Sequence, residues 1–232
     1  MEMQLYMWSG TREMIVARHD FYVDQIKSRV FAQFSHIELD AEKYGEDEFS
    51  RLSAIFDDGR HDEADVAEMA HDRAEGHYAL LSGLKVQMYL ASLAGLYHQW
   101  DKELRDFIET ELHHYIARKE ATAIAWDVHA DRGFAILSEF GWDCKAEAFY
   151  SDLDACRLVV NVYKHGKGRS LNQLADRYPE FLDLPTVLPM LGNRGDYLDH
   201  EWLRLSETQF DRIAGSLRAF WNGFPERAYV RV

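Results

Sequence analysis

The segment from Arg157 to Arg169, which reads RLVVNVYKHGKGR, has the residue types needed to hold and cleave a phosphodiester. Its four cations and lack of acids give it a net charge of +4, whereas the whole chain carries −14. A neutral histidine can accept a proton from a ribose 2′-hydroxyl, and its conjugate acid can protonate the leaving oxygen. Cations can stabilise charge on the phosphate, and a glycine-containing loop can present backbone N–H groups to it.

Arg157, Asn161 and His165 are spaced four residues apart, so they lie in one row along a helix. The predicted catalytic set is His165 as acid and base, Arg157 as the phosphate-stabilising cation, a role that Lys164 could also fill, and Asn161 as the orienting group. Asp154, three residues before Arg157, could pair with it. The predicted phosphate-binding set is Lys164, Gly166, Lys167, Gly168 and Arg169. This chemistry needs neither a metal nor another cofactor.

The same residues also have a purely structural interpretation. Cations near the C-terminal end of a helix are stabilised by the helix dipole. Asn161 can make a packing hydrogen bond at the edge of the predicted apolar stripe, which consists of Phe149, Leu153, Cys156, Val160 and Tyr163. The spacing by itself leaves both interpretations open.

Hydrophobic residues recur at helical spacing through most of the chain. All four prolines lie at or beyond Pro179, which permits long helices before that point. Tyr44-Gly45 and Asp58-Gly59 are predicted breaks. Residues 61–119 can form one very long helix or two in near line, and Gly95 is the place where a bend would be expected. Helices are predicted over residues 11–43, 47–56, 61–119, 146–165, 170–178 and 207–224, with a short one near 134–140. Gly166 follows a helix directly, where a left-handed C-cap is expected.

These elements predict an all-α fold, a helical bundle with long N-terminal helices and a C-terminal helical half. Residues 1–120 are the predicted long-helix region, with a dimerisation or accessory role, and residues 121–232 hold the basic segment. One continuous domain is the alternative division. The hydrophobic share of 47%, with 13 Phe and 12 Tyr, is ample for a core and argues against disorder.

The charge and the cysteines restrict the class of protein further. Residues 38–75 hold 14 acids and 4 bases, a net charge of −10, so they would repel nucleic acid. Cys144 and Cys156 have no zinc or disulfide spacing and are predicted to be buried thiols. The N-terminal sequence lacks the pattern of a signal peptide, and no uninterrupted apolar run approaches membrane-spanning length. A cytoplasmic protein with no membrane partner is expected.

The sequence Asn161-Val-Tyr-Lys-His165-Gly166, late on an amphipathic helix, resembles the HEPN superfamily. Its members are helical-bundle proteins, often RNases of toxin–antitoxin, abortive-infection and phage-defence systems, and others are non-catalytic. Asn161 and His165 match the Asn and His of the family motif, and the resemblance covers about residues 133–224. Val160 stands where the motif has its Arg, and Arg157 lies further from His165 than the family spacing, so the motif is degenerate.

The resemblance implies a C-terminal HEPN-like helical half and a homodimer that brings two motifs together. It implies a metal-independent endoribonuclease or RNA-binding effector in phage defence or a toxin system. RNA would bind residues 157–169, and an antitoxin or defence-system protein would be a partner. Because of Val160, it stays open whether the chain is an enzyme. The alternative is a non-catalytic helical interaction or dimerisation scaffold with a phosphate-binding basic loop, favoured if Arg157 points away from His165.

A different chemistry is suggested by two Glu-x-x-His pairs, Glu68 with His71 and Glu111 with His114. Two such pairs with two further glutamates, on separate helices of a bundle, build a carboxylate-bridged di-iron site. The order along the chain fits this poorly. If residues 61–119 form one helix, the two pairs lie about 65 Å apart along it. No metal site is therefore predicted.

Overall fold

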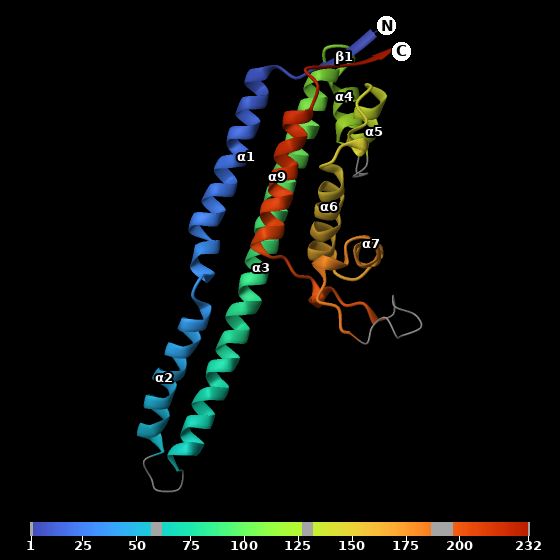
Figure 1. Cartoon of the computed structure of the whole chain (residues 1–232). Coiled ribbons are helices and arrows are strands. Elements are labelled where there is room, and N and C mark those ends of the chain that lie inside the picture. The colour runs from blue at the N-terminus through green and yellow to red at the C-terminus, as the bar shows by residue number, and fades with distance from the viewer. Residues whose placement is uncertain (1, 57–61, 127–131, 187–196, 232) are drawn as a thin grey trace. The chain divides into compact units, whose positions relative to one another are not determined.

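The structure is a computed structural model that describes residues 2–56, 62–126, 132–186 and 197–231 (Figure 1). Helices dominate this part of the chain, which confirms the predicted all-α class. The α-helices are α1 (Ser9–Arg29), α2 (Ile37–Ile55), α3 (Glu63–Leu112), α4 (Arg118–Ala125), α5 (Arg132–Glu139), α6 (Tyr150–His165), α7 (Arg169–Arg177) and α9 (Glu207–Gly223). Short 3-10 turns are η1 (Phe31–Phe34), η2 (Cys144–Ala146), η3 (Pro179–Phe181) and η5 (His200–Trp202).

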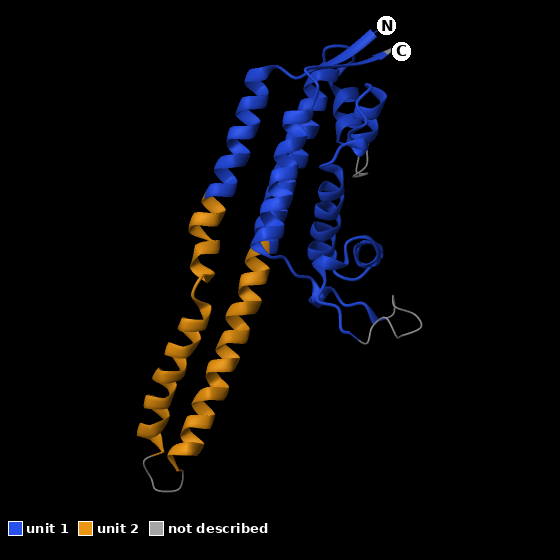
Figure 2. Ribbon diagram, in the orientation of Figure 1, with its two compact units in different colours: residues 1–24, 90–232 blue, residues 25–89 orange. Residues whose placement is uncertain are grey.

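The chain divides into two compact units (Figure 2). Unit 1 comprises residues 1–24 and 90–232, and unit 2 comprises residues 25–89. Both units draw on the predicted long-helix region 1–120. This division by packing therefore does not coincide with the division at residue 120, which stays a prediction about functional parts.

The core of unit 1 is rich in aromatic side chains. Phe220 of α9 packs edge-on against Trp100 of α3, with ring centroids 5.0 Å apart. The ring centroid of Trp142 lies 5.1 Å from that of Phe220 and 4.8 Å from that of Phe224. Such offset and edge-to-face pairs add about 0.5–1.5 kcal/mol each to the burial of the rings. The aromatic residues of α9 therefore hold it against the C-terminal half of α3.

A two-stranded antiparallel sheet joins the ends of the chain within unit 1. Strand β1 (Glu2–Tyr6) pairs with β2 (Arg227–Arg231), with Tyr6 opposite Arg227. The sequence pattern did not predict these strands, because each is short and their ladder joins residues more than 200 positions apart. Nearby, Arg12 of α1 donates to the backbone carbonyls of Asn222 and Phe224.

Unit 2 is an antiparallel helical hairpin made mainly of α2 and the N-terminal half of α3 (Figures 1 and 2). Its buried cluster is small and consists of Leu52, Val66 and Ala70, with Phe49, Phe56 and Met69 packed against it. Towards the other end of the unit, the Phe31 and Tyr89 rings pack with centroids 3.9 Å apart. Because two helices can bury only one shared stripe, much of each helix surface remains exposed.

The predicted helix over 11–43 and the predicted break at Tyr44-Gly45 are both wrong. The structure breaks the helix earlier, at η1, and α2 continues through Gly45 to Ile55, so residues 47–56 are no separate helix. Gly45 serves close packing instead. A Cβ atom there would lie 3.0 Å from the Cβ of Ala74 on α3. The glycine therefore lets two helices approach each other.

The predicted bend at Gly95 is also replaced by a close approach. Helix α3 runs as one helix through Gly95 and ends at Leu112, before the expected end near residue 119. The Tyr22 hydroxyl of α1 occupies the space that a Gly95 side chain would need, and it donates to the carbonyl oxygen of Ser92 at 3.0 Å. The missing side chain therefore makes room for α1 in unit 1.

The helices of the C-terminal half lie close to their predicted positions. Helix α6 begins at Tyr150 instead of residue 146, because Cys144–Ala146 forms a 3-10 turn. Helix α9 starts after a capping box in which Ser206 accepts from the backbone N–H of Gln209, while the Gln209 side chain accepts from the N–H of Ser206. Both cysteines are buried free thiols, as predicted.

One described helix, α3, is long and apolar enough in one 18-residue window to cross a membrane. The window has a mean hydropathy of 1.3, and 33% of it is buried inside the protein. This stretch is not an uninterrupted apolar run. Residues 76–100 mix apolar, small and neutral polar residues with a single charge, Lys85, so only their mean hydropathy is high. Core helices of soluble proteins pass the same test, and the cytoplasmic location stays a prediction.

Candidate functional site

Helix α6 is buried on most of its surface. Its apolar residues form a wider face than the predicted stripe, since Leu158, Val159 and Val162 are buried as well as Leu153 and Val160. Helices α7 and α9 both pack against α6, which explains this extent of burial. Only a narrow strip along α6 and its C-terminal end reach the surface.

Asp154 of α6 is a buried carboxylate with three partners. Its Oδ1 accepts from Arg157 Nη2 at 2.7 Å, as the spacing suggested. Its Oδ2 lies 2.6 Å from Arg177 Nη2 and accepts from the Tyr178 hydroxyl at 3.0 Å. Only 4% of the Asp154 side chain is exposed, so this pairing compensates a charge removed from water. Burial and the hydrogen bond to Asp154 raise the pKa of Tyr178 to about 12.

This network fixes the direction in which Arg157 points. Its guanidinium binds a carboxylate one turn toward the N-terminal end of α6, whereas His165 lies two turns toward the C-terminal end. The Cα atoms of Arg157 and His165 are separated by a rise of about 12 Å. The Arg157 side chain is also 16% exposed. The structure therefore places these two predicted catalytic residues on one helix but directs Arg157 away from His165.

His165 and Lys164 occupy the last turn of α6, and both are exposed. Neither side chain has a hydrogen bond or ion pair with any residue that the structure describes. Burial lowers the pKa of His98 on α3, and the positive charge of Lys164 lowers it further, which indicates that Lys164 lies near α3. Asn161 is half-buried at the edge of the α6 face, as its position in the row predicted.

The loop after α6 is tied to η5. Lys167 Nζ lies 2.8 Å from Asp199 Oδ2, and this contact raises the pKa of Lys167 and lowers the pKa of Asp199. Gly166 ends α6 with φ 70° and ψ −130°, so its φ is positive but its ψ differs from the left-handed helical cap that was predicted. A Cβ atom at Gly166 would lie 3.6 Å from the His200 ring, so the backbone angle, and not a lack of space, favours glycine there.

Two of the four cations of the basic segment are thus held in internal ion pairs. Arg157 is paired with Asp154, and Lys167 is paired with Asp199. Lys164 and Arg169 are exposed cations without an ion pair in the described residues. The site can therefore offer two cations, one exposed histidine and the loop backbone to an anion. It does not offer the Arg157 guanidinium to a ligand beside the histidine.

Sequence reasoning missed three residues that shape this site: Arg177, Tyr178 and Asp199. The only signal for the first two is that an acid on the buried face of a helix needs cationic or hydroxyl donors. Arg177 and Tyr178 lie directly before Pro179, at the end of the next helix, which is a plausible place for such donors. Nothing in the local sequence relates Asp199 to Lys167, because they are 32 residues apart.

The two Glu-x-x-His pairs are not brought together. Glu68 and His71 lie near the start of α3, and Glu111 lies at its end, followed by His114. Glu111 instead accepts a hydrogen bond from the backbone N–H of Tyr6 at 2.8 Å. Within the described ranges, no three His, Cys, Asp or Glu side chains are grouped so that they could hold a metal ion.

Comparisons of this chain with family models, curated proteins and solved structures found no match. The fold and the site define an all-α protein with a helical hairpin and a basic helix end. The resemblance to the HEPN superfamily stays a prediction that rests on Asn161 and His165.

Proposed function

We propose that this chain is a non-catalytic helical interaction protein that binds a phosphate-bearing ligand at the C-terminal end of α6. The observation that carries this proposal is the ion pair between Arg157 and the buried Asp154. Removing one partner of a buried ion pair costs about 3–5 kcal/mol, so a phosphate cannot recruit Arg157 cheaply. Without that guanidinium, His165 lacks the arginine predicted to stabilise a charged transition state with it.

Binding without cleavage is the chemistry that remains for the exposed groups. Lys164 and Arg169 can each contact a phosphate oxygen, and the loop that contains Gly166 and Gly168 can present backbone N–H groups. RNA is the first ligand to test because the Asn161–His165 resemblance points to RNA-associated proteins. An antitoxin or defence-system partner, and a role in phage defence, belong to the same proposal.

The test uses end-labelled single-stranded RNA with purified protein in EDTA, and it reads both binding and integrity of the RNA. We expect salt-sensitive binding with a log–log slope of about −1.4, because two phosphate contacts each contribute about −0.7 on single strands. The double variant Lys164→Gln/Arg169→Gln should flatten this slope and weaken binding. A matched control is Lys119→Gln/Arg118→Gln, which removes two exposed cations from another region of the chain.

Cleavage decides between the two candidate activities. We expect the RNA to stay intact with the wild type and with His165→Ala. Metal-independent cleavage that produces a 2′,3′-cyclic phosphate end and is lost in His165→Ala would overturn the non-catalytic proposal in favour of the endoribonuclease. Absence of salt-sensitive binding would overturn the phosphate site.

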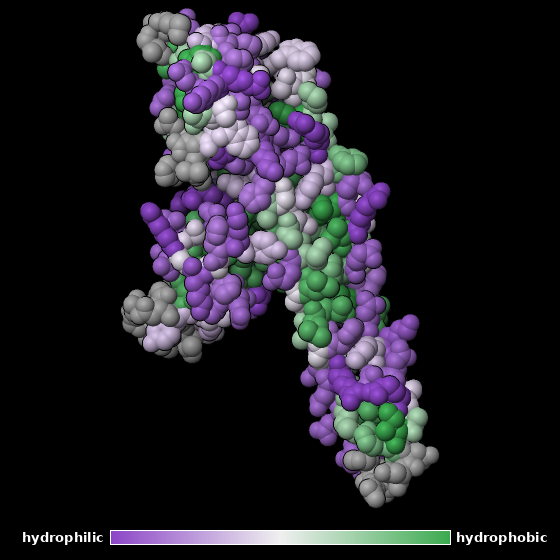
Figure 3. Space-filling view, turned by 180° about the vertical axis from the view of Figure 1, so that it is seen from behind, coloured by the Kyte–Doolittle hydropathy of each residue, from purple (hydrophilic) through white to green (hydrophobic). Residues whose placement is uncertain are grey.

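We also propose that the chain forms a homodimer through the exposed face of α3 in unit 2. Leu80 and Leu84 are 74% and 50% exposed, and Gly76 and Gly83 lie on the same face with no atom within 4 Å of an added Cβ. Figure 3 shows hydrophobic side chains gathered on the surface of the helical hairpin. This part of α3 carries no acid between Glu75 and Asp101, so two copies of an acidic chain can meet there with little repulsion.

A further inference from the structure

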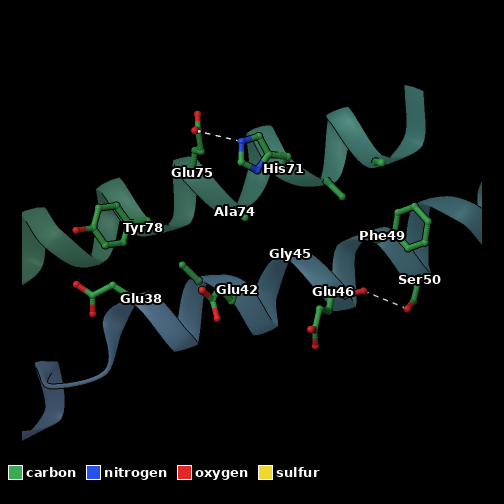
Figure 4. Close-up of a pocket in the computed structure, with 13 residues that line it drawn as sticks. Glu38, Glu42, Gly45, Glu46, Phe49, Ser50, His71, Ala74, Glu75 and Tyr78 are labelled. Atoms are coloured by element: carbon green, nitrogen blue, oxygen red, sulfur yellow. Dashed lines mark hydrogen bonds and ion pairs between the residues drawn. The ribbon is translucent and has the colours of Figure 1, made fainter. Parts of the chain in front are cut away.

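An elongated groove runs between α2 and α3 in unit 2 (Figure 4). Its volume is about 820 Å³, and its floor is apolar, with Ala41, Ala70, Ala74 and Phe49 among its lining residues. Tyr78 of α3 lies at the end nearest Glu38, and Phe49 lies toward the other end. The groove exists because the residues where α2 and α3 face each other are small. Among them, Gly45 and Ala74 allow the two backbones to approach closely.

Three glutamates follow one another along the α2 side of the groove. Glu38, Glu42 and Glu46 are spaced four residues apart, so they lie in one row (Figure 4). None of the three carboxylates has an ion pair with a residue that the structure describes. Like charges at this spacing destabilise a helix. The row is therefore unfavourable for the hairpin by itself.

Two arginines of the hairpin are engaged outside the glutamate row. Glu48 on the same helix binds both Arg51 and Arg73, and these hydrogen bonds lower the pKa of Glu48 to about 2. On the opposite side of the groove, His71 Nε2 lies 3.3 Å from Glu75 Oε1, with both side chains 70% exposed. The groove thus combines an apolar floor with negative charge that the hairpin does not neutralise.

We propose that this groove binds a basic amphipathic helix of a partner protein. The row from Glu38 to Ser50 has a helical rise of about 18 Å, which matches about three turns of a helix laid along it. Apolar side chains of that helix would enter the groove, and its Lys or Arg side chains would pair with the three glutamates. The acidic row repels nucleic acid, so the site is separate in chemistry from the phosphate site on α6.

The packing of this chain excludes its own basic segment as the occupant. Residues 157–169 are basic, but the apolar residues Leu158, Val160 and Val162 of that segment are buried in unit 1. A second copy therefore cannot present this segment as an amphipathic helix without unfolding α6. A different protein with a surface-exposed basic helix satisfies both the apolar floor and the glutamate row.

The first experiment measures binding of a fluorescently labelled peptide to the full chain by anisotropy. The probe is a helix of about 15 leucine and lysine residues with the leucines on one face, which slightly exceeds the length of the groove. A second peptide has glutamate in place of every lysine, and a third has the same composition as the first without amphipathic order. We expect binding of the first peptide only, weakening with salt.

Two matched sets of variants locate the binding. Glu38→Gln/Glu42→Gln/Glu46→Gln should weaken binding by roughly tenfold or more, because three complementary charges are lost. Asp47→Asn/Glu68→Gln/Asp72→Asn removes the same charge from exposed residues outside the groove and should change binding less than about twofold. Equal loss in both sets would overturn the proposal, since it would mean attraction to the acidic chain as a whole.

A steric variant tests the groove without altering charge. Ala67 is exposed and lines the groove, so Ala67→Trp should fill part of it and weaken peptide binding. Ala64→Trp on the same helix lies outside the groove and should leave binding unchanged. Helical circular dichroism checks that each variant is folded. Unchanged binding in Ala67→Trp, or tight binding of the acidic peptide, would also overturn the proposal, whatever the result with RNA.

Discussion

Asp154 Oδ2 and Arg177 Nη2 lie 2.6 Å apart, and this ion pair joins the N-terminal half of α6 to the end of α7. The same carboxylate also holds Arg157, so one buried acid organises two arginines and the Tyr178 hydroxyl. An acid close to the basic segment therefore serves structure. It also removes Arg157 from the set of cations that a phosphate could reach.

Asp154→Asn should destabilise unit 1 strongly. The amide cannot carry the charge that pairs with Arg157 and Arg177, so the largely buried Arg157 would lose its carboxylate partner. Loss of one partner of such a pair costs about 3–5 kcal/mol, which urea unfolding would measure. Asp176→Asn, at an exposed acid of α7, is the control and should change stability by less than about 0.5 kcal/mol. A loss below about 1 kcal/mol in Asp154→Asn would contradict the structural role of the acid.

Gly95 and Tyr22 should be strongly coupled in a double-mutant cycle. Gly95→Ala alone should destabilise the protein, because the new methyl group meets the Tyr22 hydroxyl. In the Tyr22→Phe background the hydroxyl is gone, and alanine should then be neutral or stabilising by up to about 1 kcal/mol from its higher helix propensity. Thermal unfolding of the four proteins gives the coupling energy. Additive effects would mean that the two residues do not share this space.

His19 should make stability depend on pH. Its side chain is 4% exposed, and burial lowers its pKa below the ordinary value of 6.5, while Asp20 opposes the shift and Arg218 adds to it. As pH falls below about 6.5, the unfolded chain takes up a proton that the folded chain does not, so the free energy of unfolding decreases. The decrease ends once pH falls below the folded-state pKa.

Urea unfolding at pH 7.5 and at acidic pH, in the wild type and in His19→Gln, checks this prediction. The wild type should lose more stability than the variant over the interval just below pH 6.5. Equal pH dependence in the two proteins would show that His19 titrates normally in the folded state. The comparison with the variant cancels contributions from carboxylates that titrate in both proteins.

Leu80→Gln/Leu84→Gln should shift the chain from dimer to monomer without loss of stability. Both side chains are exposed, so their replacement leaves no cavity in the folded chain. Light scattering coupled to gel filtration measures the molar mass. Leu39→Gln/Ile55→Gln removes two similarly exposed apolar side chains from α2 and should leave the dimer intact. A monomeric wild type would contradict the dimer proposal directly.

The local sequence was sufficient to predict most helices, because their signals are local. The apolar spacing of Leu153, Cys156 and Val160 predicted helix α6, and Gly166 predicted its end. The three-residue separation of Asp154 and Arg157 also suggested their ion pair, since such residues are neighbours on any helix. Helical period and short-range pairing need no knowledge of the rest of the chain.

Other features depended on packing between distant segments. Glycines look like breaks in a sequence, yet Gly45 and Gly95 are sites of close approach to Ala74 and Tyr22. Tyr163 belongs to the predicted apolar stripe but is 38% exposed, whereas Val159 is buried by neighbouring helices.

The sequence by itself determined the all-α class, the basic segment and its acidic surroundings, because composition and local period define them. Only the tertiary structure decided that Arg177 and Tyr178 bind Asp154, that Asp199 neutralises Lys167, and that α2 and α3 leave a groove between them. Each of these depends on contacts beyond the nearest turn of helix. Their physical basis is the need to pair buried charges and to pack helices through small residues.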